Sequence, residues 1–475
     1  MNYIGNYFGD GQQQYMPLLI GLYAAIIYVT VWFGWSFYNT HLHALAKFPG
    51  PRQAALSKQW MYEQHKKGFP EAVLEELHRQ YNTKALRIGP NELHITDVDL
   101  YRTIYSQSKP FPKEPAFYEI FQTPGTLFAE HEPSLHKERR KLLNPLFARS
   151  GITELEPVIT ETVDKFIRKV RRLAKKGSIN VYDGYRCVTV DVISRFAFGR
   201  STNLLNESPD SFSAEFLDVN DKLVEGIWEM YFKPVVRYMA MIIPLPVAVR
   251  FNKHLSGVLG MHQFAYESLM QYKNKTIEPS HPVIFDHLRS LTVKAQSLEA
   301  VDILVAGADT TAFTLCIASY HITRNKAIKE RLMHDLKDAI PNAEQMPSLV
   351  ELEQIPYLYA CVKEALRVAM PVPGRLPRIV PKSKDAFVVD GKIVPPGTVV
   401  GMSTYTMHNS AKIWGPDAQE LNTDRWIGSD GKRLNDHLCT FSKGARSCIG
   451  VNIAHAEIFL VLARLYRFFD ATSET

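Results

Sequence analysis

The distribution of apolar and charged residues separates a short first segment from a long remainder. Between Asp10 and Lys47 the chain carries no Asp, Glu, Lys or Arg, and residues 16–38 are almost entirely apolar. At 1.5 Å rise per residue, roughly 23 such residues form a helix of about 35 Å, which is long enough to cross a bilayer. Aromatic residues near the end of this stretch suit a membrane interface. The pattern therefore predicts a transmembrane anchor over residues 15–38.

The flanks of the anchor predict its orientation. A cleaved signal peptide is the competing interpretation, but the basic n-region and small-residue cleavage site that it needs are missing. Lys47, Arg52 and Lys58 follow the span, whereas residues 1–14 carry no Lys or Arg. The positive-inside rule then predicts a lumenal tail over 1–14 and a cytosolic body over 56–475. Pro49-Gly50-Pro51 cannot continue a helix, so residues 39–55 are predicted to be a stiff linker.

Beyond the linker, the pattern is mostly helical with small islands of strand. Apolar residues alternate around Gly89-Pro90-Asn91 and again around Asp390-Gly391, which predicts two β-hairpins. Helical segments dominate residues 132–367. The predicted fold class is therefore mainly α, with a small β portion.

Composition narrows the classes of function. The 475 residues are 46% hydrophobic and 22% charged, which is ordinary globular usage. The five cysteines are few, odd in number and far apart, which argues against a disulfide framework and indicates a reducing compartment. The net charge of +6 is modest, and the basic runs lie in no recognisable nucleic-acid-binding module. We therefore expect no nucleic acid partner.

Residues 441–450, Phe-Ser-Lys-Gly-Ala-Arg-Ser-Cys-Ile-Gly, have the features of a metal-binding thiolate loop. Apolar residues at helical spacing follow from residue 451, so Cys448 precedes a helix N-terminus, where the dipole and free N–H groups stabilise a thiolate. Gly444 and Gly450 let the backbone approach a flat ligand and adopt positive φ. Phe441 can cover the sulfur and keep water away. The alternative interpretation is a buried cysteine in a glycine-rich turn.

Polar groups within two predicted helices are further candidates. Asp309 and Thr310 fall inside the helical run 298–320, although an acid and a hydroxyl are poor helix formers unless something uses them. Thr310 can bond back to the carbonyl of residue 306, and Gly307 lets the helix deform there. Glu364 and Arg367 are i, i+3 neighbours that can pair. Incidental polar positions on a core helix and on a surface are the alternatives.

The segment 441–450 resembles the cysteine-ligand loop of cytochromes P-450, Phe-x-x-Gly-x-Arg-x-Cys-x-Gly, at all five fixed positions. The resemblance covers nearly the whole chain, from the anchor and the Pro-Gly-Pro turn to Phe469. Residues 87–93 resemble microsomal fungal members of specialised metabolism. The resemblance implies a cytochrome P-450 fold with haem (iron protoporphyrin IX) as cofactor and Cys448 as axial ligand to the iron.

The same resemblance assigns further residues to the haem. Arg446 would pair with a haem propionate. Arg140 lies in His136-x-x-x-Arg140, where many family members have Trp-x-x-x-Arg, so Arg140 and His136 would seat a propionate. Arg378 resembles another propionate-binding arginine on a strand. His136 in place of Trp is a departure from the family pattern.

Catalytic and structural roles follow by resemblance as well. Thr310 and Asp309 resemble the residues of the long distal helix that deliver protons to iron-bound dioxygen. Glu364 and Arg367 resemble the family's Glu-x-x-Arg, a buried network completed here by Arg425 that holds the core against the cysteine loop. Residues 423–426, Thr-Asp-Arg-Trp, lack the proline that usually precedes this arginine.

The implied activity is a monooxygenase that inserts one oxygen atom from O2 into a lipophilic substrate, such as a terpenoid or polyketide intermediate of secondary metabolism. No flavin or nicotinamide fingerprint occurs, so electrons are expected from a membrane NADPH–cytochrome P-450 reductase, with residues 137–141 and Lys443 facing its acidic surface. The expected location is the endoplasmic reticulum membrane, with a single pass. Apolar segments 111–128, 231–245 and 372–376 are candidates for the substrate pocket.

Two rival functions stay open. Haem-thiolate isomerases and dehydratases need no reductase, but such members commonly lack the acid and hydroxyl that Asp309 and Thr310 supply. An inactive haem-binding scaffold is suggested because the chain ends at Thr475, soon after Cys448, where family members usually continue through a hairpin that lines the pocket. Reductase-dependent turnover distinguishes the first rival, and any turnover excludes the second.

Overall fold

A computed structural model of the protein describes residues 10–251, 255–428 and 430–472 and divides the chain into two compact units. Unit 1 contains the described residues up to Ile95 and Lys382–Val400, and unit 2 contains Thr96–Pro381 and the described residues from Gly401 onward. Of the predicted lumenal tail, residues 1–9 lie outside the described residues. The part from Asp10 is already helical.

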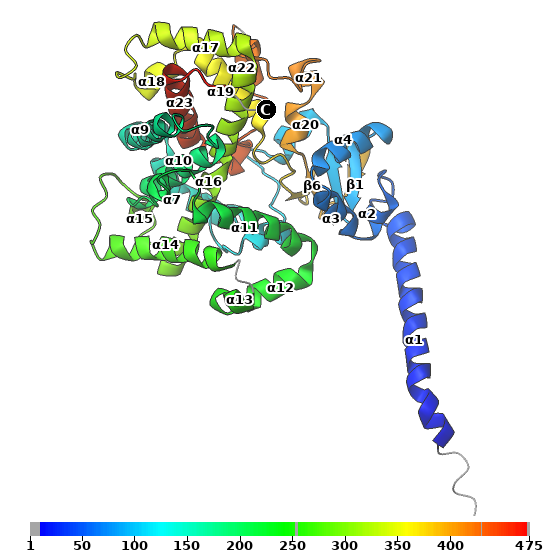
Figure 1. Ribbon diagram of the computed structural model, residues 1–475. Coiled ribbons are helices and arrows are strands. Elements are labelled where there is room, and N and C mark those ends of the chain that lie inside the picture. The colour runs from blue at the N-terminus through cyan, green and yellow to red at the C-terminus, as the bar shows by residue number, and fades with distance from the viewer. Residues whose placement is uncertain (1–9, 252–254, 429, 473–475) are drawn as a thin grey trace, which may run out of the picture. The chain divides into compact units, whose positions relative to one another are not determined.

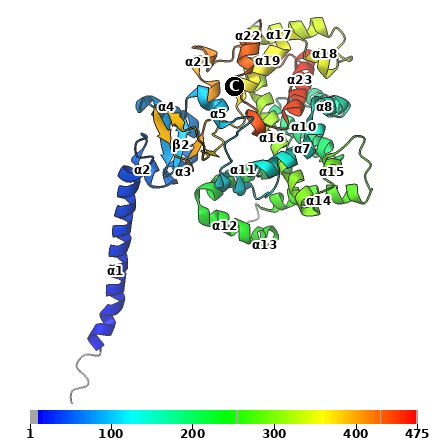
Figure 2. The ribbon, with the colours of Figure 1, turned by 180° about the vertical axis from the view of Figure 1, so that it is seen from behind.

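Unit 1 combines the N-terminal helix with short helices and strands (Figure 2). Its elements are α1 (Asp10–Phe37), a π-helical turn (Tyr38–Leu42), α2 (Arg52–Leu56), α3 (Gln59–Lys66), α4 (Pro70–Gln80), β1 (Ala85–Gly89), β2 (Glu92–Ile95), β4 (Phe387–Val389), β5 (Lys392–Val394) and the start of β6 (Val399–Gly401). The strands β1 and β2 are antiparallel, and β6 lies next to β2 in the sheet. The strands β4 and β5 form a separate hairpin. Its turn residues Asp390 and Gly391 both have positive φ, as a two-residue hairpin turn requires. Both predicted hairpins are confirmed.

The helix α1 has the length and polarity of a membrane span. The stretch Leu18–Leu42 has 25 residues with a mean hydropathy of 1.9, and none of its window is buried. In Figure 2, α1 extends as one long helix from the rest of unit 1. An apolar helix that no part of unit 1 covers leaves its side chains for lipid. The predicted anchor is therefore present as an apolar helix.

The predicted linker 39–55 packs on the sheet of unit 1. Phe48 is buried, and the carbonyl of Pro49 accepts a hydrogen bond of 2.8 Å from the Arg87 amide on β1. A Cβ at Gly50 would lie 2.2 Å from the Arg87 carbonyl oxygen, so only glycine fits this approach. The Pro-Gly-Pro turn is thus an integral part of unit 1.

Unit 2 is the helical part of the protein. Its longer helices are α7 (Pro133–Phe147), α9 (Glu156–Leu173), α10 (Val181–Phe198), α11 (Glu215–Phe232), α12 (Pro234–Ile242), α14 (Ser256–Lys273), α16 (Val293–Arg324), α17 (Lys326–Ala339), α19 (Pro356–Ala369) and α23 (Val451–Phe468). Its shorter helices are α5 (Tyr101–Ile104), α6 (Pro115–Tyr118), α8 (Arg149–Glu154), α13 (Leu245–Phe251), α15 (Ile284–His287), α18 (Leu349–Leu352), α20 (Thr404–His408), α21 (Ala411–Trp414) and α22 (Asp430–Asn435). Turns of 3-10 helix occupy Val98–Leu100, Glu119–Phe121, Leu204–Asn206, Thr423–Trp426 and Gly444–Arg446, and β3 is Arg378–Ile379. The mainly-α fold with a small β portion is confirmed.

The core of unit 2 forms around α16, which packs against α10 and α23 (Figure 1). Thr292 caps its start by accepting from the amide of Ala295. The helix is α-helical throughout its 32 residues. A Cβ at Gly307 would lie 2.6 Å from Cγ1 of Ile193, so this glycine lets α10 approach closely.

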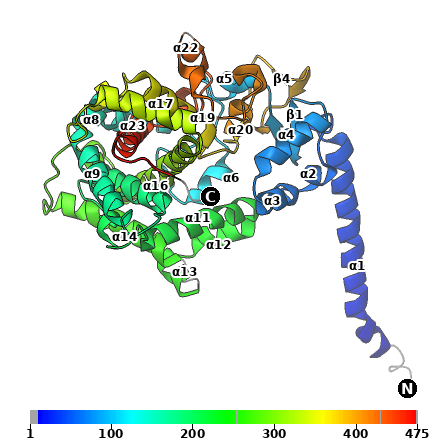
Figure 3. The same cartoon turned by 45° about the horizontal axis from the view of Figure 1, so that its top comes forward.

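Apolar side chains are exposed on α12 and α13, which follow α11 in Figure 3. Tyr238, Met241 and Phe251 are among them. The two helices are apolar enough to count together as a candidate span but are bent by 119°. The helix α16 also passes on length and composition, but half of its apolar window is buried inside unit 2, so we assign it to the core.

Candidate functional site

The cysteine loop lies directly before α23. The amide of Cys448 donates a 2.8 Å hydrogen bond to the carbonyl of Phe441, which closes the loop. Gly450 is the N-cap residue of α23, and its amide bonds to the Cys448 thiol. Cys448 thus lies at a helix N-terminus, as its sequence context predicts, where free N–H groups stabilise negative charge on sulfur.

The two loop glycines differ in their roles. Gly444 has φ +74°, and a Cβ there would lie 2.3 Å from the carbonyl oxygen of Tyr105 and 2.5 Å from that of Ser106. The expected positive φ is therefore present at Gly444. Gly450 has φ −80°, so the same expectation is wrong for Gly450, because this residue starts a right-handed helix. A Cβ at Gly450 would make ordinary contact with the Cys448 sulfur at 3.7 Å.

Cys448 is the one cysteine of the five whose side chain is exposed. The surrounding protein nevertheless desolvates the thiol, and this burial raises its pKa, opposed by the Gly450 amide and the nearby Arg140. Cys448 is thus accessible although protein atoms surround its thiol. Such a thiol is placed to receive a metal-containing ligand, which would displace its proton.

Basic groups gather in the same part of unit 2. Arg140 donates 2.6 Å to the carbonyl of Ser447, and Arg446 donates 2.7 Å to the carbonyl of Glu130. Arg378 and His136 are 2% and 4% exposed. These side chains are mutually close, since Arg446, Arg140 and Arg378 all lower the pKa of His136 to about 3, after burial. The structure thus brings together the basic residues that the resemblance assigned to propionates.

Lys113 also belongs to this basic cluster, although no motif marked it. It is 5% exposed, pairs with Arg378 in a β-bridge, and lies 4.5 Å from the Tyr118 ring centroid. Burial and the positive charges of Arg378 and Arg446 hold its pKa well below the usual range. The sequence offers only an isolated charge in an aromatic-rich segment as a signal. Buried cations such as Arg378 and Lys113 are costly unless an anionic ligand compensates them.

The predicted distal residues lie on α16. The Thr310 hydroxyl donates 3.0 Å to the carbonyl of Ala306, as its sequence position predicts. The Asp309 carboxylate accepts 2.8 Å from Nε of Arg186 on α10, and Arg186 also binds Asp221 at 2.7 Å. Sequence reasoning missed Arg186, because its partners lie far away along the chain. Asp309 is thus held in an ion pair rather than left to move without restraint.

The Glu364 network is fully buried. The Glu364 carboxylate, 0% exposed, accepts hydrogen bonds from Nε and Nη2 of Arg367 at 2.9 and 2.7 Å. It also accepts 2.8 Å from the Trp426 indole, and Arg425 Nε lies 3.4 Å away. Arg367 donates to the carbonyl of His408. The network therefore joins α19 to the segment 408–426 that precedes the cysteine loop.

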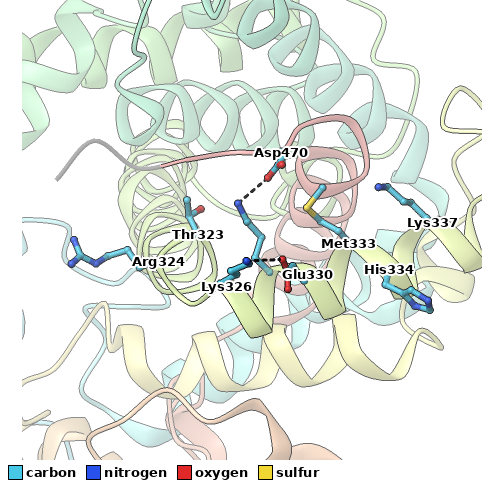
Figure 4. Close-up of a pocket in the computed structure, with 9 residues that line it drawn as sticks. Thr323, Arg324, Lys326, Glu330, Met333, His334, Lys337 and Asp470 are labelled. Carbon is cyan, nitrogen blue, oxygen red and sulfur yellow. Dashed lines mark hydrogen bonds and ion pairs between the residues drawn. The ribbon is translucent and has the colours of Figure 1, made fainter.

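A surface hollow of about 560 Å³ lies elsewhere in unit 2, where α16 ends and α17 begins (Figure 4). Its charged groups are largely paired, with Lys329 bound to Asp470 at 2.8 Å and Lys326 facing Glu330 at 3.7 Å. None of the predicted site residues lines it. It is a solvated charged surface rather than the site of the chemistry.

Haem requires of its protein an iron ligand, cations for two propionates and a close approach of backbone. Cys448 and the basic cluster supply the first two, and Gly444 supplies a loop that no larger residue could form. The residues therefore fit the group, and unit 2 defines a haem-thiolate protein.

Comparison with known proteins leads to the family. The Cytochrome P450 family matches residues 49–474. The chain is 30% identical to the cytochrome P450 monooxygenase aneF of Aspergillus aculeatus over 90% of this chain and 89% of that protein. It is 31% identical to sdnE of Sordaria araneosa over 94% and 90%, and 30% identical to sol6 of Alternaria solani over 90% and 95%. The chain belongs to the cytochrome P450 family and is a haem-dependent monooxygenase.

Proposed function

We propose that this protein inserts one oxygen atom from O2 into a lipophilic intermediate of secondary metabolism, for example a terpenoid or a polyketide, with electrons from an NADPH–cytochrome P450 reductase. The similarity to fungal P450 monooxygenases supports the reaction class. The observation that carries the proposal is the accessible Cys448 beside the buried basic cluster. The rival isomerase and scaffold functions would need no proton delivery by Asp309 and Thr310.

When bound, haem supplies the oxygen activation, and the protein's own residues bind and orient it. Cys448 would provide the thiolate that binds the haem iron, and the Gly450 amide and Arg140 would stabilise this thiolate. Arg446, Arg378, Arg140 and His136 would bind the propionates, with Phe441 and the glycines shaping the loop. The Thr310 hydroxyl would hold a proton donor beside α16, and Asp309 would relay protons from the surface of that helix.

We also propose that α1 anchors the protein in the endoplasmic reticulum membrane, with residues 1–14 in the lumen and the body from residue 56 in the cytosol. The uncovered apolar surface of α1 supports a membrane location. The charge difference between its flanks supports the orientation. The exposed basic residues of α7, including Lys137 and Lys141, would face the reductase.

Replacement of Thr310 by Ala tests the mechanism. The Thr310 hydroxyl bonds within α16, to the carbonyl of Ala306, and is not part of the cysteine loop. The thiolate Soret band of the reduced carbon monoxide complex should therefore persist in this variant. Without the hydroxyl, NADPH consumption should continue while product falls about tenfold or more and hydrogen peroxide rises, since general acid catalysis typically contributes about 10²–10⁴-fold.

Thr314→Ala is the matched control. Thr314 donates 3.0 Å to the carbonyl of Thr310, in the same i−4 geometry, but its side chain is 2% exposed and buried in the core. It should change coupling by less than about twofold. Tight coupling of NADPH to product in Thr310→Ala would refute the role of Thr310, and equal uncoupling in both variants would show a general effect on α16.

A further inference from the structure

One stripe of α16 stays accessible although the helix lies in the core of unit 2. Ala306 and Phe313 are exposed, and Asp302 and Thr310 are partly exposed. Successive members of this stripe are four, four and three residues apart, so they share one face of the helix. Thr310, to which the proposed function assigns proton delivery, therefore marks this face as the one that the substrate meets. Asp302 is the acidic member of an otherwise largely apolar stripe.

The Asp302 carboxylate has capacity for another hydrogen bond. The hydroxyl of Thr126 donates to its Oδ2 atom, and the hydroxyl of Thr123 bonds to it as well. In the described part of the chain, no Lys, Arg or His lies within ion-pair distance of Asp302. A carboxylate offers about four lone-pair positions. A buried carboxylate whose acceptor positions are only partly used is costly, so a donor on the substrate would stabilise it.

The charges around Asp302 select the kind of donor. Lys113, Arg378 and Arg446 form the nearby basic cluster, and Lys113 interacts electrostatically with Asp302. A cationic amine would be repelled by Lys113 and by the positive charge of the cluster that two propionates leave uncompensated, and a carboxylate on the substrate would be repelled by Asp302. A neutral hydroxyl meets neither penalty.

We propose that Asp302 accepts a hydrogen bond from a hydroxyl group of the substrate, so that the substrate is a neutral lipophilic alcohol. This inference rests on the proposed monooxygenase function and names its substrate class. Eight residues of helix separate Asp302 from Thr310, which corresponds to about 12 Å. The bound hydroxyl would therefore lie about two helical turns from Thr310. An earlier reaction that forms an alcohol, such as oxygenation, carbonyl reduction or addition of water, must install this hydroxyl.

The test compares three probes that share one carbon skeleton. Cedrene carries no polar group, cedrol carries a hydroxyl that can donate a hydrogen bond, and cedryl methyl ether carries an oxygen that can only accept one. Dissociation constants are read from the change in haem absorption of the full-length, haem-loaded protein. The wild type should bind cedrol about tenfold more tightly than the ether, as expected for a hydrogen bond to a charged group. Asp302→Val should abolish this preference, and the isosteric Asp302→Asn should reduce it at least about threefold.

Glu299→Gln is the control, because Glu299 lies one turn earlier on α16 but is 1% exposed and accepts from the amide of Leu127. It should keep the preference for cedrol. If Asp302→Val does not load haem, Asp302→Asn decides the question.

Unchanged preference in both Asp302 variants, or a wild type that binds no alcohol more tightly than its ether, overturns the substrate class. NADPH-dependent product formation without any preference rejects this inference alone. A preference with no reductase-dependent turnover rejects the proposed function instead.

Discussion

Replacement of Gly444 by Ala is expected to damage the cysteine loop selectively. The left-handed backbone costs an L-residue about 1–2 kcal/mol. The added Cβ would lie 2.3 and 2.5 Å from two backbone carbonyl oxygens, those of Tyr105 and Ser106, and such overpacking typically costs about 1–3 kcal/mol. The Ser106 carbonyl also accepts the Ala445 amide at 3.2 Å, so moving it away weakens a hydrogen bond. Together these effects amount to about 3–5 kcal/mol.

Gly125→Ala is the matched control, because Gly125 has the same φ of +74° but nothing within 4 Å of the added Cβ. It should cost only the backbone strain. The excess in Gly444→Ala of about 3 kcal/mol corresponds to a shift of more than about a hundredfold in the equilibrium between the native and displaced loop. The assay is the fraction of protein whose reduced carbon monoxide complex keeps the thiolate Soret band, measured after incubation at increasing temperature. If both variants lose the band at the same temperature, the close approach at Gly444 has no role in placing Cys448.

Three further outcomes are expected. Glu364→Ala should lower the free energy of unfolding by about 3–5 kcal/mol in denaturant titrations, because it leaves the buried Arg367 charge uncompensated; a loss below about 1 kcal/mol would contradict this. Burial raises the pKa of Glu299 from 4.5 to about 7, so stability should fall as pH rises from 4.5 to 7. Glu299→Gln should remove roughly 3 kcal/mol of that fall between pH 4.5 and 7, and parallel pH profiles for both proteins would refute the assignment. Residues 1–45 should retain a reporter in membranes, and protease added to sealed microsomes should degrade the body of the full chain; protection would reverse the orientation.

Local sequence determined those features whose causes lie between near neighbours. Asp390-Gly391 forms a hairpin because both residues tolerate positive φ. The apolar run of α1 defines a helix of membrane length by composition alone. Cys448 was identifiable because its loop partner Phe441 and the start of α23 lie within ten residues of it.

Tertiary structure decided everything that depends on residues far apart in the chain. The ion pair of Asp309 with Arg186 joins two helices, and no spacing rule connects positions so distant in sequence. The same holds for Lys113, whose burial beside Arg378 depends on a β-bridge between remote segments. Gly307 is a further example. A glycine within a helix suggests local flexibility from sequence, but in the structure the missing side chain lets α16 pack closely against Ile193. The periodicity of a sequence indicates which face of a helix or strand is apolar. Only the packing of the folded chain determines which side chains meet that face. Packing therefore also determines which charges are paired within the protein and which remain available for a ligand.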